Sequence, residues 1–253
     1  MLAETPHYDH RTHAGNAGDV WKHLILAEVA DYLLSKRKVL TYLESHVGYP
    51  RYNLCGSGGW VGGIGRCWPH ISALEVFCYF RIIRDMNPNG LICYPGSTDL
   101  VLEVARRKSY DIDAEVWDID PYVAASWNSD PRVKFHLEDG FIGVLHILDR
   151  TPPGMILIDP PYIDENDIRR AKNLLSYAEK AGWIVLLWQM VEEETAPEAN
   201  LRDYTLRFSD ADLDCNRWLG ATMVVAGADA HLAGHLDMQA QRFLKLASTA
   251  KSF

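Results

Sequence analysis

Residues 155–162 read Met-Ile-Leu-Ile-Asp-Pro-Pro-Tyr, and this stretch decides the fold of the chain. Four consecutive apolar residues before a pair of prolines predict a buried β-strand, because a strand cannot continue through residues that lack a backbone N–H. Asp159 is therefore expected just beyond the strand, in the crevice where an open α/β sheet usually binds its ligand. The alternative is an ordinary turn from a strand into a loop.

The residues that follow the strand suit the capture of a flat exocyclic amine. The Asp159 carboxylate and the Pro160 carbonyl can accept both N–H bonds of such an amine, while the Tyr162 ring stacks on the base. Accepting those bonds draws the nitrogen lone pair out of conjugation and frees it to attack an electrophile. We interpret Asp159, Pro160 and Tyr162 as candidate catalytic residues, with Tyr162 also binding the substrate.

Apolar β-type runs alternate with helical patterns along the chain, which predicts an α/β fold with a doubly wound, mostly parallel sheet. Residues 52–93 interrupt this alternation and are predicted to form a helical insertion subdomain within a single domain of residues 1–253. Asp19 is expected to cap the first helix. The predicted strands cover residues 39–43, 114–117, 133–137, 155–158, 183–188, 204–208 and 221–226, and the predicted helices cover residues 19–34, 71–86, 99–108, 142–148 and 167–181.

Acidic side chains recur just past the ends of the predicted strands, at Glu44, Asp118, Asp139 and Asp159. A crevice lined by such acids can hold a ribose diol, an adenine amine and a cationic sulfonium. Asp118 stands where nucleotide-binding folds place an acid that accepts both ribose hydroxyls, although it could equally cap a helix that begins at Pro121. Asp139 could read an adenine amine or form a plain turn.

The composition is that of an ordinary soluble protein, with no run of the roughly 18 apolar residues that a membrane helix needs. Five scattered cysteines without a Cys-x-x-Cys pair favour a reducing cytoplasm. A net charge of −9 weakens a nucleic-acid function without excluding it, because Lys and Arg supply most affinity for phosphates. His7, His10, His13 and His23 match no standard spacing of metal ligands, so no metal site is expected.

Several segments together resemble the RlmJ family, whose members methylate the N6 amine of adenine in large-subunit ribosomal RNA. Residues 8–23 resemble the opening pattern of the family, Y-R-H-x-x-H-A-G-N-x-x-D-V-x-K-H. The other matching segments, in the family's order, are Ser45-His46-x-Gly48, Arg51-Tyr52, Tyr94-Pro95-Gly96-Ser97, Asp139-Gly140-Phe141 and Asp159-Pro160-Pro161-Tyr162. The last segment resembles the Asp/Asn-Pro-Pro-Tyr/Phe signature of amino-methyltransferases that use S-adenosylmethionine.

This resemblance implies a Rossmann-like methyltransferase core with a small helical insertion and S-adenosylmethionine as its cofactor. The residues implied to lie at the cofactor are His23, His46, Ser97, Asp118, Asp139, Gly140 and Asp159. We expect Lys22, which is adjacent to His23, to lie near the carboxylate of the cofactor. Tyr8 is implied to contact the RNA, and we expect His10 beside it at the mouth of the crevice. The expected enzyme is a cytoplasmic monomer that methylates 23S ribosomal RNA while that RNA is protein-free or in early assembly.

Departures from the family pattern leave two other functions open. Glu44 replaces the first acid and Pro50 the second Gly of the family's loop D-T-H-A-G-A-G-R-Y, and Asp9 replaces an Arg. The first alternative is a DNA adenine-N6 methyltransferase. The second is a catalytically impaired, methyltransferase-like protein that binds nucleic acid and serves DNA uptake or use. Glu44 and Pro50 favour the impaired protein, whereas the intact Asp-Pro-Pro-Tyr sequence and His23 oppose it.

Overall fold

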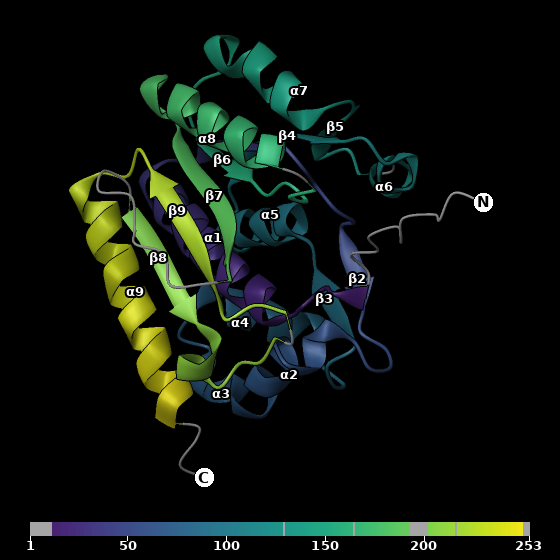
Figure 1. Ribbon diagram of the computed structural model, residues 1–253, viewed down its shortest axis with the longest axis vertical. Coiled ribbons are helices and arrows are strands. Elements are labelled where there is room, and N and C mark those ends of the chain that lie inside the picture. Colours follow the sequence, from purple (N-terminus) through teal and green to yellow (C-terminus); the bar gives the residue numbers. More distant parts are fainter. Residues whose placement is uncertain (1–11, 129, 164, 193–201, 216, 250–253) are drawn as a thin grey trace.

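The core of the molecule is a seven-stranded sheet in the order β5-β4-β1-β6-β7-β9-β8 (Figure 1). The computed structural model describes residues 12–128, 130–163, 165–192, 202–215 and 217–249. Neighbouring strands from β5 to β7 pair in parallel, and β9 pairs antiparallel with both β7 and β8. This confirms the predicted doubly wound, mostly parallel α/β sheet. The strands of the sheet are β1 (Val39–Glu44), β4 (Asp111–Asp118), β5 (Val133–Leu137), β6 (Met155–Ile158), β7 (Ile184–Val191), β8 (Arg202–Arg207) and β9 (Gly220–Ala226).

Helices cover both faces of this sheet (Figure 1). On one face α1 packs against α4, α5 and α9 and against β9, and on the other face α7 packs against α8. The helices are α1 (Ala17–Lys36), α2 (Ile64–Cys67), α3 (Ile71–Leu74), α4 (Cys78–Met86), α5 (Ser97–Lys108), α6 (Pro121–Trp127), α7 (Gly140–Ile147), α8 (Glu165–Lys180) and α9 (Ala230–Thr249), with 3-10 turns at Gly59–Val61, Trp68–His70, Leu148–Arg150 and Phe208–Ala211. Among the helices in the described ranges, none is long and apolar enough to cross a lipid bilayer.

The side chains of β6 alternate between two hydrophobic cores. Met155 and Leu157 belong to the core that contains α1, whereas Ile156 and Ile158 belong to the core beneath α7 and α8. All four side chains are fully buried. The apolar run is continuous because helices cover both faces of a parallel sheet. The strand ends at Ile158, as the prolines predict, and Asp159 follows at its carboxyl end.

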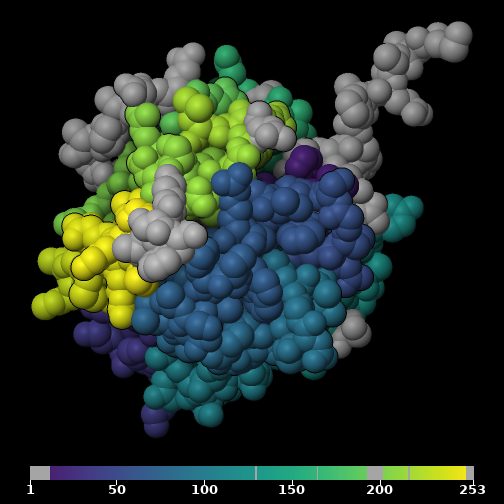
Figure 2. Space-filling view, turned by 90° about the horizontal axis from the view of Figure 1, so that it is seen from below, coloured from purple at the N-terminus to yellow at the C-terminus, as the bar shows by residue number. Residues whose placement is uncertain are grey.

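The chain between β2 (Arg51–Asn53) and β3 (Cys93–Pro95) contains α2, α3 and α4, in agreement with the helical character expected there. β2 and β3 pair antiparallel and close the base of this segment, a small sheet that was not predicted. Figure 2 shows the segment in blue beside the yellow α9, against which α3 packs. The division of the chain into one domain with a subdomain at residues 52–93 stays a prediction.

The N-terminus of α1 differs from the expectation, because Asn16 rather than Asp19 caps the helix. The Asn16 side-chain oxygen accepts a hydrogen bond of 2.9 Å from the Asp19 N–H. The Asp19 carboxylate in turn accepts a hydrogen bond of 2.9 Å from the Gly15 N–H. This reciprocal arrangement resembles a capping box, in which the acid belongs at the third helical position rather than at the cap.

The helix predicted over residues 71–86 is interrupted. α3 ends at Leu74, and Phe77 has an extended backbone with φ −95° and ψ 139° before α4 begins. Phe77 is fully buried, and its ring lies 6.1 Å from those of Phe80 and Phe243. The break therefore turns an aromatic side chain into the core, which the helical pattern of the sequence does not reveal.

α9 also lies outside the predicted elements, because Gly234 weakens its helical pattern. The helix begins where the Asp229 carboxylate accepts a hydrogen bond of 2.7 Å from the Leu232 N–H. Gly234 faces open space, so it disturbs no packing. Buried Leu236 and Phe243 hold the helix on the molecule. Tertiary packing thus outweighs the weak local propensity.

Phe243→Ala is expected to lower the free energy of unfolding by about 3–5 kcal/mol, because it leaves a cavity among aromatic rings. The Phe243 ring lies 5.9 Å from Trp21 and 6.0 Å from Phe80. Met238→Ala serves as the control, since Met238 is on the same helix but 57% exposed. The control should change stability by less than about 0.5 kcal/mol. Urea unfolding measures both variants, and equal losses would contradict the described packing of α9.

Candidate active site

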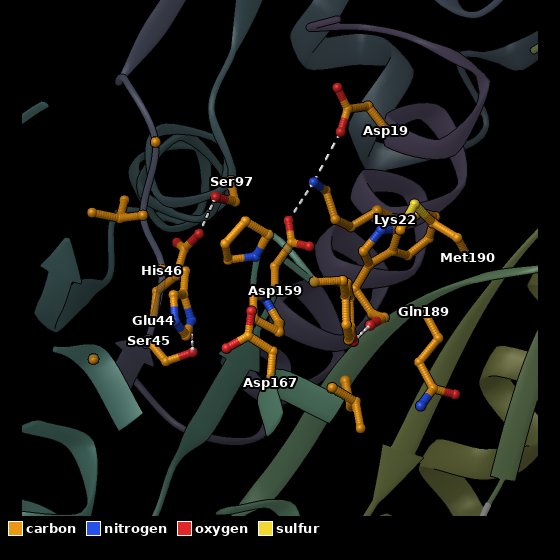
Figure 3. A pocket seen from close by; sticks show the side chains of 18 of the residues that line it. Asp19, Lys22, Glu44, Ser45, His46, Ser97, Asp159, Asp167, Gln189 and Met190 are labelled. Carbon is orange, nitrogen blue, oxygen red and sulfur yellow. Dashed lines mark hydrogen bonds and ion pairs between the residues drawn. The ribbon is translucent and has the colours of Figure 1, made fainter. Parts of the chain in front are cut away.

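A large open cleft of about 2490 Å³ runs along the edge of the sheet at which the parallel strands end (Figure 3). Every predicted site residue that the structure describes lines this cleft. Tyr8 and His10, the two residues expected to contact the substrate at the N-terminus, lie outside the described residues. The predicted residues brought together in the cleft are Lys22, His23, His46, Ser97, Asp118, Asp139, Gly140, Asp159, Pro160 and Tyr162.

Asp159 is held by Lys22, which comes from the first turns of α1. The Lys22 Nζ lies 2.6 Å from Asp159 Oδ2 and 2.9 Å from Asp19 Oδ1. Figure 3 shows Lys22 between these two carboxylates. Burial opposes the charge on Lys22, but the two carboxylates outweigh it and raise the pKa of the ammonium well above its ordinary value. Lys22 thus orients the acid of the Asp-Pro-Pro-Tyr turn, and its position near the carboxylate of a cofactor stays a prediction.

Tyr162 is fixed against β7 by its hydroxyl group, which donates a hydrogen bond to the Trp188 carbonyl oxygen. Burial raises the pKa of this hydroxyl, so the group remains a donor at neutral pH. Tyr162 has a φ of 51°, in the left-handed region that a bulky side chain adopts at a cost of roughly 1–3 kcal/mol. Strained backbone of this kind concentrates at ligand sites. The ring therefore has a fixed position beside Asp159 when a ligand arrives.

Glu44 forms a buried network that the sequence analysis did not predict. Its carboxyl group accepts hydrogen bonds from the hydroxyls of Tyr42 at 2.7 Å and Thr98 at 2.5 Å, and a further one from Ser97. Burial raises its pKa from 4.5 to about 7, although all three donors act in the opposite direction. Glu44 thus ties the end of β1 to the start of α5 and is largely neutral below pH 7.

His46 follows β1 and lies at the cofactor end predicted for the cleft. Its Nδ1 is 2.8 Å from the Ser45 hydroxyl, and its ring packs edge-on against Phe141 with centroids 4.5 Å apart. Burial lowers the pKa of His46 to about 4, despite the nearby carboxylates of Asp159 and Asp139. At neutral pH the ring is therefore uncharged, with one nitrogen donating and the other accepting.

His23 lies deeper, within an aromatic cluster behind the cleft. Its ring stacks on Tyr94 with centroids 5.4 Å apart, and its Nδ1 is 2.9 Å from the Tyr94 hydroxyl. That hydroxyl also lies 2.9 Å from the hydroxyl of Tyr79. The imidazole is thus oriented by protein groups and presents only part of its surface to the cleft.

Asp118 lies at the end of β4 and is not the cap of the following helix. The cap is Asp120, whose side chain accepts a hydrogen bond of 2.7 Å from the Tyr122 N–H. Asp118 Oδ1 accepts one of 2.7 Å from the Asp120 N–H. Burial raises the pKa of Asp118 to about 6, so the carboxylate is ionised at neutral pH and above. It can accept hydrogen bonds from a ligand on its remaining lone pairs.

Asp139 and Gly140 bring the start of α7 against the loop after β1. Asp139 caps α7 through the Ile142 N–H at 3.1 Å and pairs with Arg170 at 2.6 Å. Burial opposes ionisation, but Arg170 outweighs it and lowers the pKa of Asp139. A Cβ on Gly140 would lie 1.5 Å from the Ser45 carbonyl oxygen, so only glycine permits this approach. Asp139 therefore caps a helix rather than forming a plain turn, and its contact with an adenine amine stays a prediction.

Arg170 and Trp188 complete the site, although no sequence motif indicates them. Arg170 also stacks on Phe141, with its guanidinium carbon 4.4 Å from the ring centroid. The Lys22 ammonium lies 5.7 Å from the centroid of Trp188. The only sequence signal for these two residues is position, since α8 follows the Asp-Pro-Pro-Tyr turn and β7 pairs with β6.

The chain is similar in sequence to known proteins. The family described as "Ribosomal RNA large subunit methyltransferase D, RlmJ" matches residues 37–207, more than half of the chain. A ribosomal RNA large subunit methyltransferase J from Haemophilus influenzae is 33% identical over 63% of this chain and 60% of its own length. The protein of the same name from Escherichia coli is 29% identical over 73% of this chain and 70% of its own length.

The fold is also that of a solved structure. The crystal structure of a protein from Legionella pneumophila superposes with a TM-score of 0.74 at 20% identity, covering 93% of this chain and 94% of the other. This similarity shows a shared fold over nearly the whole length. The relative from Haemophilus influenzae is matched over less than two thirds of its length, and the one from Escherichia coli over slightly more.

Glu44→Gln should change the pH dependence of stability. Between pH 4.5 and about 7 the folded protein keeps a proton on Glu44 that the unfolded chain has lost, so Glu44 lowers stability as the pH rises. The Glu44→Gln variant has no carboxyl group at this position, so this fall in stability with rising pH does not occur. Relative to the original protein, its free energy of unfolding should rise by on the order of 3 kcal/mol across that interval.

Urea unfolding of both proteins at several pH values provides the measurement. The result is read as the difference in free energy of unfolding between the variant and the original protein at each pH. This difference is needed because His46 has the opposite effect in both proteins: since its pKa is lowered to about 4, stability is lost as the pH falls from 6.5 to about 4. Glu165→Gln, at an exposed position on α8, is the control. A difference between Glu44→Gln and the original protein that stays constant with pH would show that the folded protein ionises Glu44 normally.

Proposed function

We propose that this chain, which belongs to the RlmJ family of ribosomal RNA large subunit methyltransferases, methylates the N6 amine of an adenine in 23S ribosomal RNA. The observation that carries the proposal is the fixed Asp159 carboxylate, bound by Lys22 and adjacent to Pro160 and the immobilised Tyr162. The proposal includes S-adenosylmethionine as the methyl donor and a cytoplasmic monomer as the acting form.

The residues of the cleft fit S-adenosylmethionine, which supplies an electrophilic methyl group when bound. We assign the ribose hydroxyls to Asp118, since its carboxylate is ionised at neutral pH and retains free lone pairs. The adenine end belongs beside Asp139 and Gly140. His46 and Ser97 are neutral groups next to the loop after β1, where the amino acid part of the cofactor would lie. The volume of about 2490 Å³ exceeds the roughly 300–1,000 Å³ of a single-ligand pocket, which leaves room for a nucleotide.

Asp159 acts as an acceptor in this mechanism. Lys22 occupies Oδ2, which leaves Oδ1 and the Pro160 carbonyl to accept the two N–H bonds of the adenine amine. Tyr162 stacks on the base, which must leave its helical stack at a cost of a few kcal/mol. Asp159 Oδ1 receives the surplus proton of the amine after alkylation. The carboxylate and the ring are positioned beforehand, and such preorganised electrostatics supply much of an enzyme's rate.

Asp159→Ala should lower the rate of methyl transfer by roughly 10²-fold or more, the scale seen when a positioned electrostatic group is lost. The rate is measured at saturating S-adenosylmethionine, so that a weaker affinity for the cofactor does not contribute. Asp113→Ala is the matched control, because Asp113 is an exposed aspartate at the opposite end of β4. A fully active Asp159→Ala enzyme would exclude the Asp-Pro-Pro-Tyr turn from the chemistry.

The substrate is tested by incubating the protein and labelled S-adenosylmethionine with total ribosomal RNA from a strain that lacks the protein, and separately with genomic DNA. We expect label in N6-methyladenosine of the large-subunit RNA and little in duplex DNA, where flipping must break a base pair. Label in DNA alone would make the protein a DNA methyltransferase. Calorimetric binding of the cofactor with no label in either nucleic acid would indicate the impaired binding protein.

A further inference from the structure

Residues 47–50 belong to the loop after β1, and each of the four is hydrogen-bonded through its backbone to a different segment of the fold. Two of the partners are backbone groups, near the end of β4 and just before α5, and two are aromatic side chains, on β2 and at the end of α6. The four bonds run from the Val47 N–H to the Trp117 carbonyl (2.9 Å), from the Trp127 indole N–H to the Gly48 carbonyl (2.9 Å), from the Tyr49 N–H to the Tyr52 hydroxyl (3.0 Å) and from the Gly96 N–H to the Pro50 carbonyl (2.8 Å).

Trp127 supplies one of these bonds from the end of a neighbouring helix. It is the last residue of α6, and its side chain is buried. α6 follows Asp118, the carboxylate that we assign to the ribose of the cofactor. The bond from Trp127 to the Gly48 carbonyl therefore connects the segment after β4 to the loop after β1, so that both sides of the proposed cofactor site are held together.

Tyr52 supplies the other side-chain bond and also shapes the loop. Its side chain is buried, and its ring lies edge-on to that of Tyr49, with centroids 6.1 Å apart. A Cβ on Gly48 would lie 2.3 Å from the Tyr52 hydroxyl oxygen, so the glycine leaves the space through which this hydroxyl reaches the Tyr49 N–H. The proposed chemistry gives Tyr52 no role, although Arg51-Tyr52 is one of the segments that resemble the family.

The loop lies at the end of the cleft proposed for the amino acid part of S-adenosylmethionine. The cleft there is lined by Ser45, His46, Val47, Gly48, Tyr49, Tyr52 and Ser97. A loop that is ordered before its ligand arrives loses little conformational freedom on binding, which favours affinity. If the loop could adopt other conformations, the apparent affinity would fall in proportion to the fraction of molecules that hold the binding conformation.

We propose that Tyr52 and Trp127 are positioning residues that hold the loop after β1 in the conformation that binds S-adenosylmethionine. Each acts through the backbone of the loop, Tyr52 on Tyr49 and Trp127 on Gly48. This inference rests on the proposed function, because it takes S-adenosylmethionine as the ligand. It explains how a loop in which Pro50 replaces a glycine can keep a defined shape, because that shape depends on side chains outside the loop.

The test is calorimetric binding of S-adenosylmethionine to the original protein, to Tyr52→Phe, to Trp127→Phe and to the double variant. Each single variant should raise the dissociation constant by about threefold to tenfold, the range expected for the loss of one hydrogen bond. The double variant should raise it by about tenfold or more. The rate of methyl transfer at saturating S-adenosylmethionine should stay within about twofold of the original, since only binding of the cofactor is weakened.

Trp21→Phe/Tyr204→Phe is the matched control, because it removes the same two chemical groups elsewhere in the core. The Trp21 indole N–H donates to the Tyr204 carbonyl at 2.7 Å, and the Tyr204 hydroxyl donates to the Ala233 carbonyl at 3.2 Å. Both side chains are buried, and neither is among the described residues that line the cleft. The control should unfold at a lower urea concentration than the original protein, with an unchanged dissociation constant for S-adenosylmethionine.

The outcomes separate this inference from the proposed function. An unchanged dissociation constant in a folded Tyr52→Phe/Trp127→Phe variant would overturn the positioning role and leave the proposed function intact. Equal increases in this variant and in the control would also overturn it, because a general loss of stability would then account for both. A rate at saturating cofactor that falls as far as the affinity would assign the two residues to the chemistry instead. An original protein that does not bind S-adenosylmethionine would contradict the proposed function and this inference together.

Discussion

The ion pair between Lys22 and Asp159 is the interaction on which the site depends. It joins α1, which is buried along most of its length, to the end of β6 at the centre of the sheet. A buried lysine is tolerated only when carboxylates compensate its lost hydration, and Asp19 and Asp159 do so together. This cluster of one cation and two carboxylates therefore carries one net negative charge. The Asp159 carboxylate can therefore accept N–H bonds from an amine. The packing of α1 and the position of this acceptor depend on the same ion pair.

Much of the charge that lines the cleft is compensated locally, although the chain carries a net charge of −9. Charges on an exposed surface are screened beyond roughly 8–10 Å at physiological salt, so the local arrangement outweighs the total. His46 is neutral through burial, and Asp139 is compensated by Arg170. These groups therefore add little net charge to the cleft, although the chain as a whole is acidic.

Local patterns predicted the strands and their acids, because each depends on neighbours in the sequence. The four apolar residues and two prolines set both ends of β6, and the same reasoning placed Asp118 and Asp159 at the carboxyl edge. Contacts between distant residues were not predictable in this way. Lys22 and Asp159 are 137 positions apart, and Glu44 meets Ser97 across 53 positions. The local sequence does not indicate which distant side chains lie together in the folded sheet.

The two departures from the family's loop meet at the same place in the structure, the start of α5. Glu44 accepts hydrogen bonds from Ser97 and Thr98, the first two residues of that helix. The Pro50 carbonyl oxygen accepts a hydrogen bond of 2.8 Å from the N–H of Gly96, the residue that precedes α5. The longer acid thus anchors the helix that carries Ser97 into the cleft through its side chain, whereas the contact of Pro50 uses a backbone carbonyl that any residue has. Glu44 is also largely neutral below pH 7, so it adds little repulsion beside Asp159. The side chain of Glu44 therefore has defined partners, which argues for an altered support of the loop after β1 rather than for its decay.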